Sequence, residues 1–556
     1  MGLPGQGEPG WRPPAREPAE GRRGGVRRAV RRAGDAFGDF WFTRSLGARR
    51  LIAGGAAALV AIVLALLLLG GGSPPDDAEE LVPADAFIYA HLHTDEGSAQ
   101  FQQAVRLGGR LQRLPELLQA LTDTLRPSTP SPVSLADDVR PWLGGELAVA
   151  VLPEGGGGRV ALLESKDDAA ARKFAEEAEA GGILASELVD GFLVLGLKDA
   201  VDAVAATARG GESLADAPAA QAAREDLPGE RVADLYISPA GGRFLRERSP
   251  RLASQLDTFL DLPASEGAAG ALVARDGGLE LKLVSNLNPA RQRDRPSFFR
   301  SFPPFGPKLD DEPSAGAVAY LGLGSPDASL RSLLATARAA APALARSFQD
   351  FARQLRRDAR INLARDVLPL LSGETAVFVE PSAEVPVVTL VVDGVDEKRA
   401  GRALAGISGS LVRAARRNRL AEGAQPRIEE TRSDGVPLRS IRLSSTVNLA
   451  YAIFDGKLVV ATDPAGIGQV QRGETHLNRT AVFQRATSPL PDNVSAVLFL
   501  NLGQAFRLAE PAGLAEDPVY ASFSEDIRKL GGLGVGVNSD ADSLRTVAFL
   551  TIEEGK

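Results

Sequence analysis

The chain of 556 residues contains no cysteine, three histidines and one methionine, and only 5% of its residues are aromatic. Without cysteine it forms no disulfide and offers no thiolate, which excludes cysteine nucleophiles, cysteine-ligated zinc and iron–sulfur clusters. Three histidines leave little material for a Ser-His-Asp triad, and the G-x-S-x-G and P-loop motifs are absent from the sequence. The sequence therefore indicates neither a catalytic site nor a cofactor, and it predicts a protein that is not an enzyme.

Long apolar runs are also scarce, with one exception at residues 51–69. This segment, LIAGGAAALVAIVLALLLL, has 19 residues without a charge. As a helix it would be about 28 Å long, which matches the hydrocarbon core of a bilayer. It is apolar on every face, whereas a surface helix of a globular protein has a polar side. We therefore expect one transmembrane helix, spanning the membrane from Leu51 to Leu69.

The charges on either side of this run predict its orientation. Residues 1–50 contain 11 Arg and five acidic residues, whereas the acidic sequence SPPDDAEE follows the run. The positive-inside rule then places the N-terminus in the cytoplasm and the rest of the chain outside, at the cell membrane. A cleaved signal peptide is the rival interpretation, but its basic and apolar regions would be unusually long, and GGGSPP is no A-x-A cleavage site.

The part of the chain beyond the basic tail is acidic. Subtracting the tail from the 63 basic and 71 acidic residues of the whole chain leaves 52 and 66, a net charge of −14. Nucleic-acid binding needs a basic face, so nucleic acid is not an expected partner. The expected partners are the membrane itself and either a protein or a lipid of the cell envelope.

An internal duplication is the second strong signal. Five blocks of sequence recur in the same order in two halves of the chain, and chance does not account for their common order. The first members are PADAFIYAHL, DDVRPWLGGELAVAVLP, VDGFLVLGLKDAVDAV, LPGERVADLYISPAG and GAAGALVARDGGLELKLV. Their counterparts are PSAGAVAYLGL, RDVLPLLSGETAVFVEP, FDGKLVVATDPAGIGQV, LPDNVSAVLFLNLGQ and GLGVGVNSDADSLRTVAFL. The second half is longer because polar, Arg-rich residues 410–437 are inserted between its second and third blocks.

Each half has the same predicted order of elements. A short strand (87–92; 317–323) precedes a long helix (98–125; 330–358), then a hairpin (146–152 with 160–163; 375–379 with 387–392) and a second helix. The next hairpin turns at Asp-Gly, at Asp190 and Asp455, which is among the strongest local hairpin signals. A helix, a strand, a helix and a final hairpin follow. Hairpins separated by helices predict an α+β fold with two duplicated halves of mostly antiparallel sheet.

These observations divide the chain into six parts. We expect a disordered basic cytoplasmic tail (1–50), the transmembrane helix (51–70), a linker (71–80), an extracytoplasmic α+β repeat (81–286), a connecting segment (287–312) and a second repeat (313–553). The proline and arginine content of the connecting segment argues against regular structure there. Its four phenylalanines suggest that it packs onto a domain: Phe298, Phe299, Phe302 and Phe305.

His91 and His93 are the only weak candidates for a metal site. They are two residues apart on a predicted strand, so their side chains share one face, and Asp95 and Glu96 lie close enough in sequence to be considered as further ligands. The equivalent strand of the second half has no histidine, and we predict no metal site. The repeated Gly145-Glu146 and Gly373-Glu374 are explained as a turn glycine entering a strand, and Asp190 and Asp455 as turn formers.

The basic tail, the single span, VPADAFIYAHL just beyond it, the LGGELAVAV strand and the Asp-Gly hairpin resemble a family of bacterial membrane-anchored proteins that is defined as a domain of unknown function, DUF3352. The resemblance covers about residues 80 to 553. It implies an extracytoplasmic α+β protein without an established activity, and no catalytic residues are carried over. The long tail and the 410–437 insertion do not align with it.

Three functions fit these features. The first is a membrane-anchored, extracytoplasmic protein of the cell envelope that binds or scaffolds without catalysis. The second is an envelope hydrolase with a carboxylate site between the halves. The third is a carrier of a lipid or another apolar ligand, since two halves of sheet and helix can enclose a cavity.

Overall fold

A computed structural model describes residues 76–554, apart from 112–137, 154–157, 180–184, 293–301, 328–351, 354–355, 358–359, 383–384, 418–424, 434, 443–447, 474 and 512. The basic tail and the apolar run 51–69 lie outside this part of the chain. Among the helices that the structure describes, none has the length and apolar character needed to cross a bilayer.

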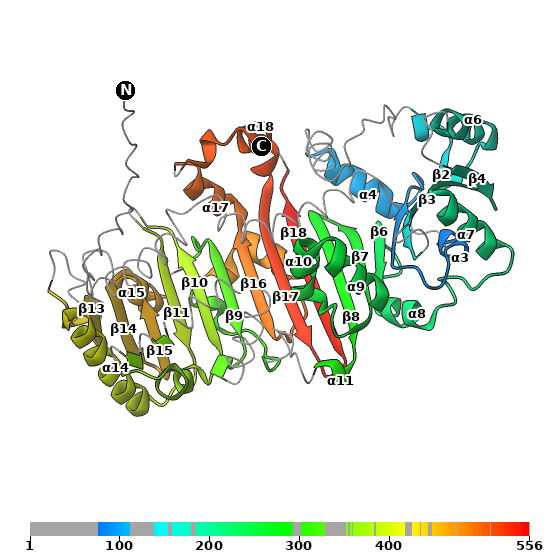
Figure 1. The fold of residues 1–556 in the computed structure, drawn as a ribbon. Helices are drawn as coiled ribbons and strands as arrows, with labels where there is room; N and C mark the ends of the chain where they lie inside the picture. The colour runs from blue at the N-terminus through cyan, green and yellow to red at the C-terminus, as the bar shows by residue number, and fades with distance from the viewer. Residues whose placement is uncertain are drawn as a thin grey trace, which may run out of the picture.

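The fold is α+β, and its centre is one antiparallel sheet of 18 strands, which runs through the length of the molecule (Figure 1). The first half contributes the strands β4-β5-β3-β2-β1-β6-β7-β8 in spatial order. Their bounds are β1 Ile88–His93, β2 Leu143–Leu152, β3 Gly158–Ser165, β4 Ala185–Val189, β5 Phe192–Gly196, β6 Ala233–Ile237, β7 Ser265–Arg275 and β8 Gly278–Leu287.

The second half repeats this order as β14-β15-β11-β10-β9-β16-β17-β18. Their bounds are β9 Ala319–Leu323, β10 Thr375–Glu380, β11 Val387–Val392, β14 Asn448–Phe454, β15 Lys457–Ala461, β16 Ala496–Asn501, β17 Leu530–Ser539 and β18 Ser543–Ile552. The predicted duplication is therefore visible as two equivalent sets of eight strands.

The inserted residues extend the sheet by one hairpin. β12 (Arg427–Ser433) and β13 (Val436–Arg442) pair with each other, and β13 continues the sheet beyond β14. The helix before them, α14 (Glu397–Arg417), is longer than its counterpart α6 (Asp168–Glu179). The Arg-rich insertion is thus the end of a long helix and an added hairpin at the edge of the sheet.

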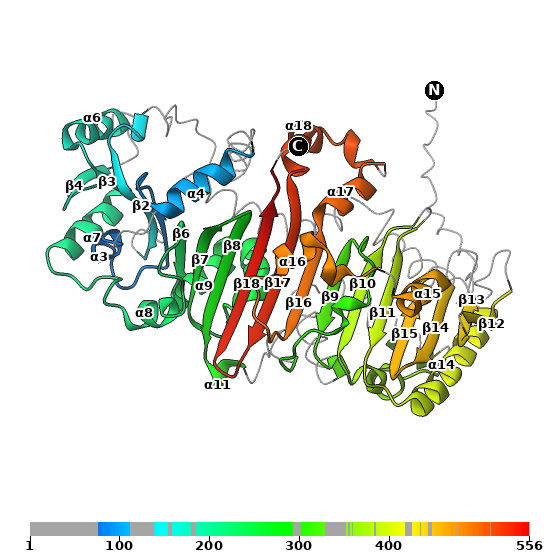
Figure 2. The ribbon, with the colours of Figure 1, turned by 180° about the vertical axis from the view of Figure 1, so that it is seen from behind.

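The two halves join through their equivalent last hairpins. β8 pairs antiparallel with β18 from Ser543–Asn286 to Thr551–Gly278, without a register shift. Since β7–β8 and β17–β18 hold the same place in their halves, this contact has the two-fold character of a homodimer interface built within one chain. The sheet is continuous across the junction (Figure 2).

Helices lie on both faces of the sheet (Figures 1 and 2). In the first half they are α3 Ala78–Leu81, α4 Ala99–Gly108, α6, α7 Lys198–Ala208, α8 Pro218–Arg224, α9 Pro239–Arg248, α10 Pro250–Leu260 and α11 Pro289–Gln292. In the second half they are α14, α15 Pro464–Arg472, α16 Ala481–Thr487, α17 Leu502–Ala509 and α18 Pro518–Ile527, with the short helices η5 Leu309–Asp311, η7 Leu363–Val367, η8 Leu368–Leu371, η9 Leu477–Arg479 and η10 Leu514–Glu516.

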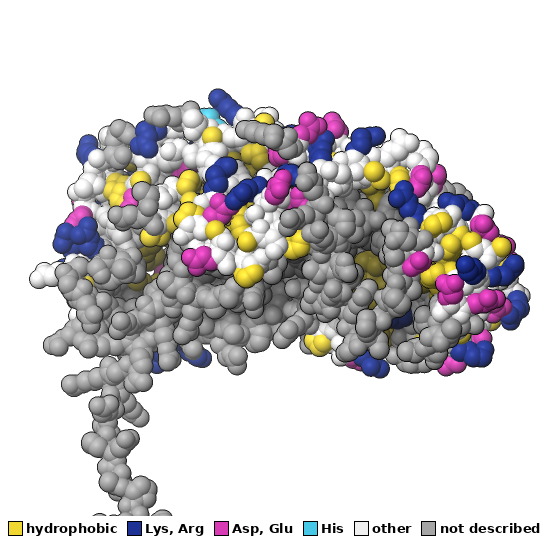
Figure 3. Space-filling view, turned by 90° about the horizontal axis from the view of Figure 1, so that it is seen from above, with side chains coloured by type: hydrophobic (Ala, Val, Ile, Leu, Met, Phe, Trp, Pro, Cys, Tyr) yellow, Lys and Arg dark blue, Asp and Glu magenta, His cyan; other side chains and the backbone are white. Residues whose placement is uncertain are grey.

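Because side chains alternate along a strand, those of β1 pack into two cores, one on each face of the sheet. Leu92 packs with α4, α9 and α10 in a core that continues across β8 and β18 into the second half. Tyr89 faces the opposite side and packs with α3, α7 and α8. His91 and His93 share the face of Tyr89 because they are two and four residues further along the strand. On the outer surface, basic and acidic side chains are interspersed on the face seen in Figure 3.

The local hairpin signals are confirmed. Asp190-Gly191 and Asp455-Gly456 turn between β4 and β5 and between β14 and β15. All four residues have positive φ (43°, 84°, 51° and 71°), as a type I′ turn requires. The predicted strand at 87–92 is shifted by one residue. Most of the long helices predicted over 98–125 and 330–358 lies outside the described residues, and α4 ends at Gly108.

The connecting segment is more ordered than its composition predicts. α11 and η5 lie in it, so the expectation that regular structure is absent was wrong at these two places. Phe302 is 1% exposed, and Phe305 packs against the core of the second half, which confirms that the segment is held against a domain. Phe298 and Phe299 lie outside the described residues.

Gly278 lies where the backbones of β8 and β18 approach each other closely enough to exclude a side chain, so its substitution tests the packing of the junction. A Cβ built there would lie 2.2 Å from the carbonyl oxygen of Leu550 in β18, which is a backbone atom. We expect Gly278→Ala to lower the free energy of unfolding by about 1–3 kcal/mol, because the two strands must separate locally. The measurement is thermal and denaturant unfolding of the full chain in detergent. Gly229→Ala is the matched control, since a Cβ there meets no atom within 4 Å, and equal stability of the two variants would contradict the prediction.

Candidate metal centre

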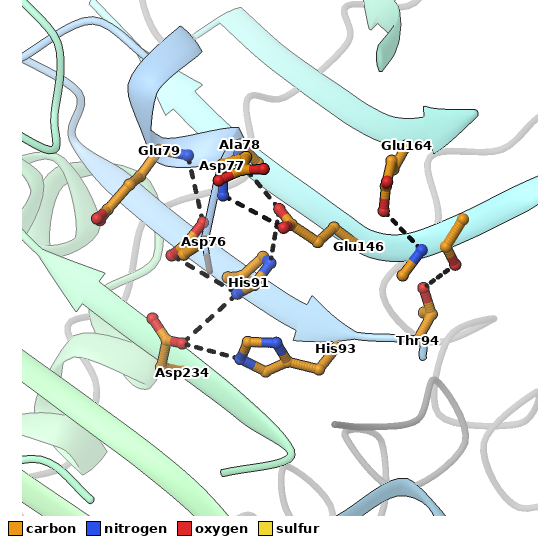
Figure 4. A network of polar contacts seen from close by, with 12 residues as sticks. Asp76, Asp77, Ala78, Glu79, His91, His93, Thr94, Glu146, Glu164 and Asp234 are labelled. Carbon is orange, nitrogen blue, oxygen red and sulfur yellow. Dashed lines mark hydrogen bonds and ion pairs between the residues drawn. The ribbon is translucent and has the colours of Figure 1, made fainter. Parts of the chain in front are cut away.

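Two histidines of β1 are buried in the first half. His91 and His93 are each 1% exposed, and their rings make an edge contact with centroids 4.3 Å apart. β1 lies between β2 and β6, so both neighbouring strands supply side chains to the same face. A cluster of ionisable groups results, and its members come from four separate places in the sequence (Figure 4).

Asp234 of β6 faces His91 directly across the strand pair. Its Oδ1 lies 3.6 Å from His91 Nδ1 and 3.9 Å from His93 Nε2, and the carboxylate is 3% exposed. Arg231 donates from Nε to the same oxygen at 2.7 Å and fixes its position. Asp234 thus bridges the two imidazoles (Figure 4).

Asp76 reaches the cluster from the segment just before α3. Its Oδ2 lies 3.5 Å from His91 Nδ1, while Oδ1 accepts hydrogen bonds from the Tyr89 hydroxyl and from the backbone N–H of Glu79. Arg224 of α8 lies over the ring of Tyr89, 5.3 Å from its centroid, and forms an ion pair with Glu79. These contacts hold the carboxylate of Asp76 against β1.

Glu146 of β2 approaches the other side of the imidazole. Its Oε2 lies 3.4 Å from His91 Nε2. The same carboxylate accepts backbone N–H groups of Asp77 and Ala78, at 3.2 and 3.1 Å, and so stabilises the N-terminus of α3. Glu146 therefore has a structural partner of its own, and His91 is an additional contact.

Many polar atoms of this cluster are buried without a hydrogen-bond partner. They are Asp76 Oδ2, Asp234 Oδ2 and both ring nitrogens of His91 and of His93. The carboxylate–imidazole distances of 3.4–3.9 Å are longer than an N–H···O hydrogen bond, which is about 2.9 Å. Leaving such atoms without hydrogen bonds costs about 1–3 kcal/mol each, and a ligand bound among them would remove part of this cost.

The titration behaviour of the two rings differs. Burial opposes a charge on His91, but the carboxylates of Asp234, Glu146 and Asp76 outweigh it and raise the pKa of this ring to about 10. Burial and the neighbouring charge of His91 lower the pKa of His93 to about 3. Without another cation, His91 is therefore an imidazolium and His93 a neutral ring at pH 7.

The carboxylates respond in opposite directions. Burial raises the pKa of Asp76 to about 6, since the attraction of His91 compensates only in part. Burial also opposes ionisation of Asp234, but its contact with His91 and the charge of Arg231 hold its pKa well below the usual range. Asp234, which lies between the two histidines, therefore stays ionised to lower pH than Asp76 does.

The donor set fits a divalent transition-metal ion. His91, His93 and Asp234 each offer one ligand atom, and these atoms lie within 4.8 Å of one another. A tetrahedral ion with bonds of about 2.0–2.1 Å separates its ligands by roughly 3.3 Å, so a small inward movement closes the set. Asp76, whose Oδ2 lies 3.5 Å from His91 Nδ1, is the nearby carboxylate that would supply a fourth ligand. Glu146 would contact the free nitrogen of His91, in the manner of the outer carboxylates that orient metal-bound imidazoles.

The second half shows what the fold requires and what it does not. Its Glu374 accepts the N–H groups of Lys308 and Leu309 at the start of η5, as Glu146 does for α3. From this equivalence and the strand registers, Tyr89 corresponds to Tyr320, whereas the two histidines correspond to glycines and Asp234 to Val497. The capping glutamate is thus shared, and the candidate metal ligands His91, His93 and Asp234 belong to the first half alone.

The glycines of the second half could not be replaced by the histidines of the first. A Cβ at Gly322 would lie 2.9 Å from Cγ1 of Val497, and one at Gly324 would lie 2.3 Å from the carbonyl oxygen of Pro303. An apolar side chain and the connecting segment therefore fill the space that the ionisable cluster fills in the first half. The second half has the same strand order without the cluster, so this strand arrangement does not require it.

A family model described as "Protein of unknown function (DUF3352)" matches residues 46–187 and 178–532, which is most of the chain and includes the strands from β1 to β16. The chain belongs to this family. A comparison with curated proteins gave no match. The family match confirms the resemblance drawn from the sequence, extends it to residue 46, and spans the inserted hairpin β12–β13.

In this DUF3352 protein, the sequence identified only two members of the cluster. His91 and His93 do share a face, but Asp95 and Glu96, considered as ligands, lie elsewhere: Asp95 accepts the N–H of Gly97, and Glu96 forms an exposed ion pair with Arg140. Asp76, Glu146 and Asp234 were missed as partners. Asp234 carried a weak signal, as a single acid within the apolar strand block VADLYI.

The repeated glutamates were also interpreted incompletely. The sequence interpretation explained the glycine of each Gly-Glu pair as a turn residue but assigned no role to the glutamate. In the structure, the carboxylates of Glu146 and Glu374 each stabilise a helix N-terminus. Recurrence of Gly-Glu in both halves was the available signal for that role.

Removal of the charge of Asp234 tests the electrostatics of the metal-free cluster. We expect Asp234→Asn to lower the free energy of unfolding by about 3–5 kcal/mol in the presence of a chelator, because it removes a partner of a buried cation. Asp226→Asn is the matched control: Asp226 pairs with Arg545 at 45% exposure, and such surface pairs contribute about 0–1 kcal/mol. Similar unfolding midpoints for both variants would show that the cluster is not a coupled charge network.

Proposed function

We propose that this protein is a single-pass, membrane-anchored protein of the cell envelope, with its N-terminus in the cytoplasm and the sheet domain outside. The domain binds or scaffolds a partner without catalysis, and it holds one divalent transition-metal ion, such as Zn²⁺, as a structural element. The observation that carries the metal assignment is that His91, His93 and Asp234 bring buried ligand atoms together, and that both imidazoles and Oδ2 of Asp234 lack hydrogen-bond partners.

The closure of this site supports a structural role for the ion. The three ligands are 1–3% exposed, and Glu146 beside them is 2% exposed. Catalytic zinc sites keep a position open for water or substrate, whereas structural sites are closed by protein ligands. A closed site in one half also agrees with the absence of catalytic sequence motifs.

The position of the site indicates what the ion would stabilise. Asp76 precedes α3, and β1, β2 and β6 supply the other groups. The chain reaches Asp76 from the apolar run by way of the short linker GGGSPP. An ion coordinated here would fasten the membrane-proximal end of the domain to the centre of its sheet, and would resist separation of that end from the fold.

The membrane anchor is supported by the sequence. The apolar run is long enough to span a bilayer, and arginines flank it on the N-terminal side only. The family match begins at residue 46 and so includes the run. We infer that an N-terminal anchor holds the sheet domain close to the outer surface of the membrane.

The junction between the halves favours binding or scaffolding over the two alternatives. A hydrolase with carboxylates between the halves needs a cleft there, but the halves meet as paired strands β8 and β18. A carrier of an apolar ligand needs an apolar cavity, and the cavity that lies beside α14 is rimmed with arginine. A continuous rigid sheet supplies long surfaces for a partner.

Metal content tests the assignment directly. We expect the full chain, purified in detergent, to contain about one zinc ion per molecule by elemental analysis after reconstitution and desalting. His93→Ala should lose this ion, because a primary ligand is removed. Glu146→Gln should retain it but weaken its affinity about 10–100-fold, as outer carboxylates do.

His476→Ala is the matched control for this measurement. His476 lies in the second half, where its Nδ1 contacts the carbonyl oxygen of Asp311, and its loss should leave the zinc content unchanged. Wild-type protein that binds no stoichiometric metal, or His93→Ala protein that binds as much as the wild type, would contradict the metal assignment.

Protease accessibility tests the topology. In intact cells whose outer barrier is permeable to protease, the sheet domain of the full chain should be digested, while a tag on residue 1 stays protected until the membrane is disrupted. The mature protein should retain residues 51–69 in its mass. A protected sheet domain, or a mature chain that begins after the apolar run, would refute the anchor.

A further inference from the structure

A second polar site lies in the other half of the molecule, beside the long helix α14. A cavity of about 330 Å³ opens between the first turns of α14 and the segment that contains η7 and η8. The charged residues that line it are four arginines, Arg360, Arg365, Arg399 and Arg402, and one acid, Asp366. The cavity therefore has a strong excess of positive charge.

The single carboxylate of the cavity is already engaged. Asp366 accepts from Arg365 Nε at 2.6 Å and from its Nη2 at 3.2 Å. It also accepts the backbone N–H of Asn362 at 2.8 Å. The pKa of Asp366 is lowered by its contact with Arg365, and the charges of this pair offset each other in the wall. Three guanidinium groups of the lining remain.

Within the part of the chain that the structure describes, Arg360, Arg399 and Arg402 make no ion pair with an acidic side chain. Arg399 and Arg402 are three residues apart on α14 and so share one face of the helix. The next residues on that face are small, namely Ala403, Gly406 and Ser410. A Cβ built at Gly406 would meet no atom within 4 Å, so the cavity is open above this position.

The floor of the cavity is apolar. Ile361 and Leu370 are 3% and 7% exposed and line it together with Ile407. The three arginines themselves are exposed, so their attraction for an anion is screened by salt, and the apolar floor excludes water on one side only. Three unpaired cations around an apolar base are the reverse of the first-half cluster, where the acids are in excess.

We propose that this cavity, the arginine cleft, binds a phosphate-bearing anion through Arg360, Arg399 and Arg402. Guanidinium groups fit phosphate oxygens in pairs, and three of them match a phosphate group better than a carboxylate with its two oxygens. The ligand is either a soluble phosphate or the phosphate headgroup of an anionic lipid. This proposal is independent of the metal site, since it uses other residues in the other half.

The test is calorimetric titration of the full chain in a non-ionic detergent. The probes are inorganic phosphate and, separately, dihexanoyl phosphatidylglycerol below its micellar concentration, both at fixed ionic strength. We expect saturable binding of at least one probe with a stoichiometry of one. Arg399→Gln and Arg402→Gln should each weaken it by about tenfold or more, because each removes one charge-assisted contact with the anion.

Two further variants separate binding from folding. Arg507→Gln removes an exposed arginine of α17 and should leave the affinity unchanged. Gly406→Phe fills the cleft without changing a charge, and should abolish binding while the circular dichroism spectrum and the thermal unfolding midpoint stay as in the wild type.

The outcomes are distinct. Binding of inorganic phosphate identifies a soluble phosphate ligand, and binding of the lipid alone identifies a headgroup site; both support the proposal. If neither probe binds, the proposal is overturned. Binding that Arg399→Gln, Arg402→Gln and Gly406→Phe leave unchanged also overturns it, since that would place the anion elsewhere on the chain.

Discussion

The pairing of β8 with β18 is the contact on which the architecture depends. Each half has a sheet of its own, but the hairpins β7–β8 and β17–β18 would each end in an unpaired strand if the halves were separate. An exposed edge strand of that length pairs readily with another chain. Joining the two equivalent edges satisfies both backbones at once and merges the apolar side chains of the two hairpins into one core. The duplication thus acts as a homodimer whose subunits are covalently linked.

Duplication also separates the residues that the fold needs from those that it merely allows. Glu146 and Glu374 have the same role in their halves: each accepts hydrogen bonds from the backbone N–H groups at the start of the short helix that precedes the first strand. Tyr89 and Tyr320 are buried at the same place. The histidines and Asp234 have no such counterparts, and Val497 with the connecting segment fills their place. Burying five ionisable groups costs free energy that apolar residues at this position do not, which is the physical reason to connect the cluster with a ligand.

The two halves therefore differ in the sign of the charge that each one concentrates. The first half has concentrated carboxylates around two imidazoles inside its sheet. In the second half, arginines lie close together at the surface beside α14. This helix is longer than its counterpart α6 and is followed by the additional hairpin β12–β13. The proposed cation site and the proposed anion site therefore lie in different halves and use side chains of opposite charge.

The sequence by itself determined the α+β class, the duplication, the order of the hairpins and the Asp-Gly turns, because these depend on local periodicity and on residues that tolerate positive φ. It also showed that His91 and His93 share a face, since alternation along a strand is local. Only the tertiary structure decided which carboxylates they meet. Asp76, Glu146 and Asp234 come from a loop and two strands that lie far apart in the chain, and their approach depends on strand order and register. The continuous sheet across the junction was likewise decided there, because strand pairing between halves leaves no periodic signal in either strand.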